Sequence, residues 1–410
     1  KGHYGLVSNM DLTKGRVQAH RDGYGFVVPT DGEEDIYLSS RQMLRVFDGD
    51  EVLARVDGVD IRGRREGVIV EVLARNTSQV VGKLVRQGAI EFVEPDNPRI
   101  HQDVQLPPGS SGTAEPGQVV VVEITEQPEF RRKPVGRVVE ILGDPMGPGM
   151  EIDIALRSHD LPWQWPQSVQ EEAAAFGPEV REEDKKHRVD LRKLPLVTID
   201  GGDARDFDDA VYCKPTKLGG WRLYVAIADV SHYVAVGSAL DAEAHKRGTS
   251  VYFPERVIPM LPEELSNGLC SLNPKVDRLC MVCDMRVSAR GVVTSFRFYE
   301  GLMRSHARLT YDQVGRFLSE EDAAAIPAGV RRPVGDLHRL YLALINARQR
   351  RGAIDFDTEE TRIVFGADRK IEKIVPVQRN DAHRLIEECM LAANVSAAQF
   401  LDRMGLPGLY

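Results

Sequence analysis

A dense group of acidic side chains follows one short hydrophobic run. The run 196–199 has the composition of a buried strand, and five carboxylates follow it within ten positions: Asp200, Asp203, Asp206, Asp208 and Asp209. Aspartate is unfavourable inside strands and like charges repel, so this density costs stability unless cations neutralise it. Ligand sets made only of oxygen suit Mg²⁺ or Mn²⁺. The pattern therefore indicates a site for a hard divalent cation.

The spacing of these aspartates excludes one familiar cation site and leaves three interpretations open. Counted from Asp200, the offsets are 0, 3, 6, 8 and 9. A calcium-binding EF-hand instead needs acidic residues at its first, third and fifth positions, followed by glycine. Two divalent ions about 3.5–4 Å apart, held by shared carboxylates, stabilise both oxygens of an in-line phosphoryl displacement. The residues alone are compatible with a solvated acidic turn, a structural metal or such a catalytic site.

The elements that must position these carboxylates belong to a mixed region. From residue 195 to 410 the pattern predicts strands such as 221–229 and 280–287 and long helices at 334–351 and 381–404, which is an α+β domain. Gly and Pro dominate residues 143–149, so the stretch 144–194 is predicted to be a linker with short helices, one of them at 167–175.

The first third of the chain contains a faint internal repeat. Three glycines, Gly15, Gly49 and Gly67, are matched 67 to 69 residues later by Gly82, Gly117 and Gly136. Each copy consists of short β-branched runs separated by Gly, Pro, Asn and Asp, which is typical of a small antiparallel barrel. We therefore expect two tandem five-stranded OB-type barrels, at residues 1–75 and 76–143.

Both predicted barrels carry side chains suited to nucleic acid. Tyr24 and Phe26 alternate along one strand face, where they could stack on bases or, alternatively, belong to the barrel core. Basic clusters precede the last strand of each copy, at the loop that OB-folds use for oligonucleotides, or are merely solvated. They are Arg62, Arg64 and Arg65 in the first copy and Arg131, Arg132 and Lys133 in the second.

Overall composition restricts the partners and the compartment. The chain of 410 residues has 53 Lys+Arg against 62 Asp+Glu, a net charge of −9, so bulk electrostatic capture of nucleic acid is not expected. No run of eighteen apolar residues predicts a membrane span. Five scattered cysteines indicate reduced thiols and a cytoplasmic location, and we expect Cys280 and Cys283 to face opposite sides of a strand rather than share a zinc ion.

Three longer stretches carry a family resemblance. Residues 199–212 (IDGGDARDFDDAVY), 248–283 and 298–311 (FYEGLMRSHARLTY) resemble the catalytic RNB domain of the ribonuclease II/R superfamily, most closely its bacterial ribonuclease R branch. The resemblance covers nearly the whole chain, because this family carries two cold-shock domains before its catalytic domain. It also implies that the catalytic domain is truncated here on its C-terminal side.

The resemblance implies a processive, Mg²⁺-dependent 3′→5′ exoribonuclease that releases nucleoside 5′-monophosphates from single-stranded and structured RNA. Two Mg²⁺ ions are expected, with Mn²⁺ as a substitute, in a cytoplasmic monomer whose partner is RNA. The four essential aspartates correspond to Asp200, Asp206, Asp208 and Asp209, and an aromatic clamp on the terminal nucleotides corresponds to Tyr252 and Phe356. His383 is expected to be a packing or hydrogen-bonding residue.

Two other functions remain open at this stage. The chain could be an RNA-binding adaptor in which the barrels work and the nuclease domain is silent. Alternatively, the same carboxylates could serve a DNA nuclease or a phosphatase, although the barrels and the aromatic clamp favour the ends of polynucleotides.

Overall fold

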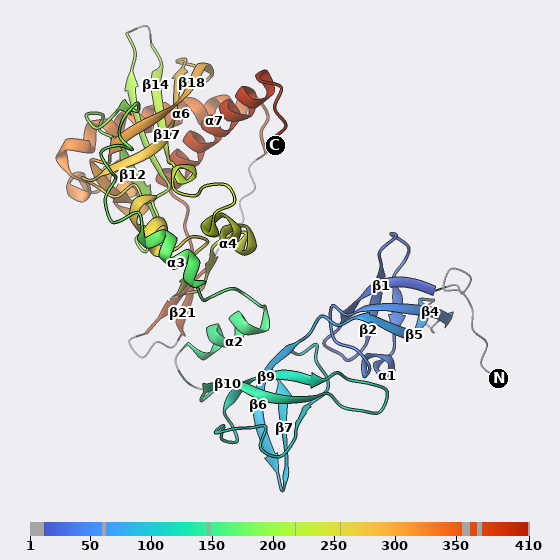
Figure 1. Cartoon of the computed structure of the whole chain (residues 1–410). Coiled ribbons are helices and arrows are strands. Elements are labelled where there is room, and N and C mark those ends of the chain that lie inside the picture. The colour runs from blue at the N-terminus through green and yellow to red at the C-terminus, as the bar shows by residue number, and fades with distance from the viewer. Residues whose placement is uncertain are drawn as a thin grey trace. The chain divides into compact units, whose positions relative to one another are not determined.

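The computed structural model describes residues 12–59, 63–145, 147, 149–217, 219–254, 256–354, 361–366 and 371–408. The chain folds as two compact units, Lys1–Trp163 and Gln164–Tyr410 (Figure 1). None of the helices in the described ranges is both long and apolar enough to cross a membrane.

The first unit contains two closed five-stranded barrels. The first barrel is built from β1 (Leu12–Ala19), β2 (Gly25–Pro29), β3 (Ile36–Leu38), β4 (Glu51–Val59) and β5 (Arg65–Ala74), with the short helix α1 (Ser40–Met43) after β3. The second barrel is built from β6 (Gln79–Gln87), β7 (Ile90–Pro95), β8 (Val104–Leu106), β9 (Val119–Glu126) and β10 (Val135–Gly143). Helix α2 (Met150–Ser158) follows within the same unit.

The two barrels have the same topology. Around each barrel the order is fourth, first, second, third and fifth strand, closed by pairing of the fourth with the fifth. The matched glycines have matched surroundings: Gly15 pairs with Pro29 and Gly82 with Pro95, and a Cβ at either glycine would collide with a carbonyl of the neighbouring strand. Gly49 and Gly117 both adopt positive φ, at 83° and 97°, in the turns that lead into β4 and β9. The repeat in the sequence is therefore a repeat in the structure.

The second unit is organised around a seven-stranded sheet with the order β11-β18-β17-β14-β13-β12-β19. Its strands are β11 (Val189–Asp190), β12 (Val197–Asp200), β13 (Asp209–Pro215), β14 (Trp221–Ala228), β17 (Asp277–Val287), β18 (Val293–Arg304) and β19 (Ala307–Thr310). Two short hairpins lie outside this sheet: β15 (Val251–Tyr252) with β16 (Val257–Ile258), and β20 (Thr361–Phe365) with β21 (Ile371–Pro376).

Helices cover both faces of this sheet and create two hydrophobic cores. On one face pack α5 (Tyr311–Leu318), α6 (Ala328–Arg350) and α7 (Asp381–Arg403). On the other pack α3 (Gln167–Ala174), α4 (Ala239–Arg247) and the π-helical segment η3 (Glu264–Leu269). Two short 3₁₀ segments, η2 (Val230–His232) and η4 (Ala323–Ala325), complete the connections. Cys280 lies in the second core and Cys283 in the first, so this CxxC pair is split across β17 as expected.

The structure confirms the predicted architecture of two OB-type barrels followed by an α+β domain. The barrel strands fall within the predicted ranges 1–75 and 76–143, while the stretch 144–194 is divided between the two compact units. Helix α6 begins at Ala328, six residues before the predicted start. Pro333 lies inside it and lacks the N–H that would donate to the Gly329 carbonyl, and the burial of Val330 favours the longer helix.

Crowding at the first repeat glycine makes a prediction about stability. Gly15→Ala should destabilise the first barrel by about 1–3 kcal/mol, because the added methyl group meets the Val28 carbonyl oxygen and Val27. Gly58→Ala, in β4 of the same barrel, is the matched control, since nothing lies within 4 Å of its new Cβ. Urea denaturation of both variants measures the difference, and equal stabilities would contradict this account of the repeat.

Candidate functional site

The sheet brings the two ends of the acidic stretch together. Strand β12 ends at Asp200, β13 begins at Asp209, and the two strands pair antiparallel through Val197 and Val211. On its other side β12 pairs in parallel with β19, and Asp200 lies opposite Thr310. The loop between β12 and β13 therefore holds its aspartates at one end of three adjacent strands.

Phe207 anchors this loop to the protein interior. Its ring is buried, its N–H donates to the Ser271 hydroxyl oxygen at 3.0 Å, and its carbonyl accepts from the Leu272 N–H at 2.8 Å. The same Ser271 hydroxyl donates to the Arg205 carbonyl at 2.9 Å. Because the backbone is fixed on both sides of Asp206, the loop presents its carboxylates from a rigid base.

Arg308 of β19 fixes the loop from the other side. Its Nη2 donates to the Ala204 carbonyl at 2.7 Å, and its guanidinium carbon lies 4.4 Å from the centre of the Phe207 ring. A cation over an aromatic face is an attractive arrangement. Arg308 was not among the predicted site residues, although it lies within the stretch 298–311, about a hundred positions from the loop that it contacts.

The carboxylates raise one another's pKa. Burial is the main cause that raises the pKa of Asp209 to about 7, and the charges of Asp200 and Asp208 add to it. Burial likewise raises the pKa of Asp200 and of Asp208, with a further contribution from Asp206 in each case. Carboxylates that destabilise each other's ionised forms are the electrostatic signature of a site that gains from a bound cation.

One unpartnered atom gives a direct test of whether a cation suits this cluster. The Oδ2 atom of Asp209 is buried and has no hydrogen-bond partner in the described part of the protein. A buried carboxylate oxygen without a partner is costly, and a hard cation would satisfy it. Within the described ranges, no three His, Cys, Asp or Glu side chains already form a complete metal-binding group. The donors thus fit a divalent ion in type and charge, although the described side chains are not arranged as a complete ligand set.

Three aromatic side chains surround the aspartates. The Tyr252 hydroxyl donates to Asp206 Oδ2 at 2.9 Å, so the structure places this predicted clamp residue at the acidic cluster. Tyr311, the first residue of α5, stacks on His383 of α7 with ring centres 4.0 Å apart. Burial, followed by the charges of Asp200 and Asp209, raises the pKa of Tyr311 to about 12. Phe356 lies outside the described residues.

His383 and Tyr311 were not among the predicted site residues. His383 does pack and hydrogen-bond as expected, since its ring stacks on Tyr311 and caps the start of α7 through Asn380. Its charge also acts on Asp200, whose pKa it lowers against the other contributions. Tyr311 ends the stretch 298–311, and that position was the available signal in the sequence.

In the first barrel the predicted stacking residues form a cluster of rings. Tyr24 lies 5.8 Å from Phe26 and 4.3 Å from the stacked ring of His20. Neither Tyr24 nor Phe26 belongs to the buried core. Tyr37, which pairs with Phe26 across β2 and β3, completes the cluster, and the Arg64 guanidinium lies 4.1 Å from the centre of its ring. The alternation of Ile36, Tyr37 and Leu38 could have revealed this third ring.

The other predicted basic residues have acidic or aromatic neighbours. Arg65 forms an ion pair with Glu33 at 3.2 Å, and Arg132 pairs with Glu126 at 2.9 Å. Arg131 has a positive φ of 71°, and its guanidinium lies 5.2 Å from the Phe130 ring centre. Arg62 lies outside the described residues. The ring cluster with Arg64 is therefore the stronger candidate surface for nucleic acid in the first unit.

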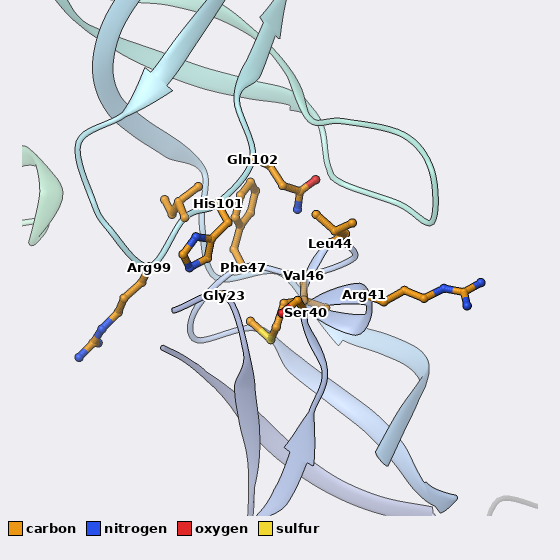
Figure 2. Close-up of a pocket in the computed structure, with 11 residues that line it drawn as sticks. Gly23, Ser40, Arg41, Leu44, Val46, Phe47, Arg99, His101 and Gln102 are labelled. Carbon is orange, nitrogen blue, oxygen red and sulfur yellow. The ribbon is translucent and has the colours of Figure 1, made fainter. Parts of the chain in front are cut away.

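A pocket of about 400 Å³ lies beside this cluster, between the two barrels (Figure 2). Barrel 1 contributes a largely apolar wall that includes Val46 and Phe47, and residues 99–102 of barrel 2 form the other side. His101 Nε2 lies 3.0 Å from the His20 carbonyl oxygen, which links the pocket to the ring cluster. In Figure 2 the side chains of Arg41 and Arg99 extend outward from opposite sides of the pocket.

Models of known protein families match nearly the whole chain. The RNB domain model matches residues 188–410, the cold shock domain model residues 92–166, and the ribonuclease B OB domain model residues 15–72. The match to the RNB domain includes all four aspartates singled out above.

Individual proteins that are similar to this chain agree with the family matches. Ribonuclease R of Escherichia coli is 54% identical over 408 residues, which cover 99% of this chain and 50% of that protein. Mycoplasma genitalium RNase R bound to ribose-methylated single-stranded RNA superposes with a TM-score of 0.89 at 28% identity, covering 96% of this chain and 62% of that one. The same protein bound to double-stranded RNA gives 0.78 at 29% identity, over 88% and 61%. The chain spans about half the length of the curated relatives it matches first.

The electrostatics of the cluster predict how metal-free stability depends on pH. The pKa of Asp209 is about 7 in the folded protein and roughly 3.9 for an aspartate in an unfolded chain. The stabilisation that Asp209 contributes is therefore complete below a pH of roughly 3.9 and is lost as the pH rises through 7. In EDTA, Asp209→Asn should therefore raise the melting temperature at pH 8 relative to the parent and have less effect at pH 5.

Differential scanning calorimetry across this pH range checks the prediction. Asp203→Asn is the matched control, because Asp203 is an exposed residue of the same loop and should leave the melting temperature nearly unchanged. A lower melting temperature for Asp209→Asn at pH 8 would show that Asp209 stabilises the empty site instead.

Proposed function

Because the chain belongs to the RNB (ribonuclease II/R) family, we propose that it forms the RNA-admitting and metal-binding part of a hydrolytic 3′→5′ exoribonuclease. The products are nucleoside 5′-monophosphates, released processively from single-stranded RNA and from structured RNA with a 3′ overhang. The observation that carries this proposal is the acidic cluster, in which the charges of Asp200, Asp206, Asp208 and Asp209 act on one another and one buried oxygen of Asp209 lacks a partner.

The chain's own side chains have distinct parts in this chemistry. Asp200 and Asp209, at the ends of β12 and β13, would hold a divalent ion most directly, Asp206 would support that assembly, and Asp208 would orient the attacking water. Two Mg²⁺ ions, with Mn²⁺ as a substitute, would supply charge stabilisation for the attacking and leaving oxygens. The Phe207 anchor and the Arg308 contact keep the carboxylates in place without closing the exposed side of Asp208.

Aromatic side chains would hold the RNA at both units. Tyr252, with 64% of its surface exposed, and Phe356 would clamp the terminal nucleotides, because stacking grips any base without reading the sequence. In the barrels, Tyr24, Phe26 and Arg64 would contact the strand upstream, together with Arg65, Arg131 and Arg132. RNA complexes of the Mycoplasma genitalium relative with single- and double-stranded RNA support this assignment. We further propose a cytoplasmic monomer.

A non-enzymatic role as an RNA-binding adaptor is the alternative. That alternative would be favoured by loss of an aspartate, and Asp200, Asp206, Asp208 and Asp209 are all present. Burial, followed by the charges of Asp200 and Asp208, raises the pKa of Asp209, which supports an intact acidic site.

The nuclease proposal predicts a metal-dependent activity that one substitution removes. The full-length protein that contains this chain, without substitutions, should release nucleoside 5′-monophosphates from a 3′-tailed RNA in Mg²⁺. It should not do so in EDTA or from a matched DNA. Asp208→Asn should lower this rate at least a hundredfold, on the order of the effect of losing a group that acts on the reacting atoms. Asp203→Asn is the control and should retain activity.

Chromatographic separation of the products measures these outcomes. Equal rates for the parent and Asp208→Asn would contradict the proposed mechanism, and so would cleavage of a circular RNA, which has no 3′ end. RNA binding without any hydrolysis in Mg²⁺ would favour the adaptor.

The ring cluster predicts a separate effect on RNA affinity. Tyr37→Leu should weaken binding of a single-stranded oligonucleotide by about 1–3 kcal/mol, because a stacked base loses its aromatic partner. Arg132→Gln, whose side chain is already paired with Glu126, should have a smaller effect. Fluorescence anisotropy in EDTA gives both affinities, and a larger loss for Arg132→Gln would place the RNA on the second barrel's loop instead.

A further inference from the structure

The Tyr252 side chain has two parts in different surroundings. Its ring is largely exposed, with 64% of the residue's surface accessible, on the two-residue strand β15. Its hydroxyl group instead reaches the acidic cluster and donates to Asp206 Oδ2 at 2.9 Å. A residue needed only for stacking on a base would not require this second contact, because phenylalanine offers an equivalent ring face.

The hydroxyl matters because of how little else restrains Asp206. In the described part of the protein, Tyr252 makes the one hydrogen bond that the Asp206 carboxylate accepts. The backbone of the next residue is fixed by Ser271 and by the burial of Phe207, but neither contact involves the Asp206 carboxylate. Tyr252 therefore selects the rotamer of a carboxylate whose backbone is already anchored.

The hairpin that carries Tyr252 is itself held in place. Strand β15 pairs with β16 through Val251 and Ile258, and Ile258 is buried. The Ser250 hydroxyl accepts a hydrogen bond from the Met260 N–H at 3.0 Å and closes the hairpin from the other end. The Tyr252 hydroxyl is thus positioned by a hairpin that is held by its own contacts.

We propose that the Tyr252 hydroxyl is a positioning group for Asp206: it occupies one carboxylate oxygen and turns the other toward the divalent cation. This inference rests on the proposed function, since it assumes that the aspartates bind a metal. A carboxylate has two oxygens and about four lone-pair directions, so one hydrogen bond leaves ample capacity for a cation. Hydrogen bonds to the ligands of a metal typically change its affinity by about 10–100-fold.

The arrangement also links the metal to the end of the RNA. The same side chain would stack on a terminal base through its ring and hold Asp206 through its hydroxyl. Each ligand restrains Tyr252 in the orientation that the other requires, so their affinities should be coupled, and by equal factors in both directions.

The test separates the hydroxyl from the ring with two substitutions. Tyr252→Phe removes only the hydroxyl, and Tyr252→Leu removes the ring as well. Tyr299→Phe is the matched control, because its hydroxyl lies 3.3 Å from another carboxylate, Asp284, outside the acidic cluster. Mn²⁺ affinity is measured without RNA by electron paramagnetic resonance of the free ion, and affinity for a single-stranded RNA is measured in EDTA.

Tyr252→Phe should bind Mn²⁺ about 10–100-fold more weakly than the parent while keeping its RNA affinity. Tyr252→Leu should lose both affinities, and Tyr299→Phe neither. In an Asp206→Asn background, Tyr252→Phe should have no further effect on Mn²⁺. Excess Mg²⁺ should restore turnover by Tyr252→Phe, since a weakened metal site can still be saturated, whereas a general structural defect would not be rescued.

Mn²⁺ affinity within twofold of the parent for Tyr252→Phe would overturn the positioning role and leave the proposed nuclease function standing. An additional loss from Tyr252→Phe in the Asp206→Asn background would overturn it as well, because the effect would then not act through Asp206. Absence of Mn²⁺ binding by the parent would overturn both this inference and the proposed function.

Discussion

Uncompensated negative charge at the ends of β12 and β13 is the constraint on which the second unit depends. Asp200 and Asp209 are brought together by strand pairing, and Asp209 keeps a buried oxygen without a partner. Such an arrangement persists only because the surrounding sheet and its two hydrophobic cores supply enough stability to offset the repulsion. The protein thus holds a crowded group of carboxylates at this end of the sheet.

The supporting contacts come from distant parts of the chain. Arg308 on β19, Ser271 after η3 and Tyr252 on β15 each bind the loop between β12 and β13 at a different point. Two of these contacts fix the backbone and the third fixes a side chain. This division explains how an irregular loop can present carboxylates with defined positions.

In the first unit, basic side chains have acidic or aromatic neighbours and do not form a broad positive surface. This agrees with the chain's net charge of −9. Arg65, at the start of β5, and Arg132 are engaged in ion pairs, whereas Arg64 lies over the ring of Tyr37. RNA would therefore be gripped by stacking and a few local cations rather than by a broad positive surface. Such a surface tolerates any base sequence.

The sequence by itself determined the duplicated barrels, the mixed strands and helices of the second unit, and the group of aspartates. These features depend on local spacing and composition. The glycine offsets were informative because Gly15 and Gly82, and likewise Gly67 and Gly136, leave no room for a Cβ in either barrel, while Gly49 and Gly117 both adopt positive φ. Only the tertiary structure decided that Tyr252 bonds Asp206, that Arg308 braces the loop, and that Tyr311 and His383 border the site. Those pairs lie tens of residues or more apart, and strand order and packing, which no local pattern encodes, bring them together.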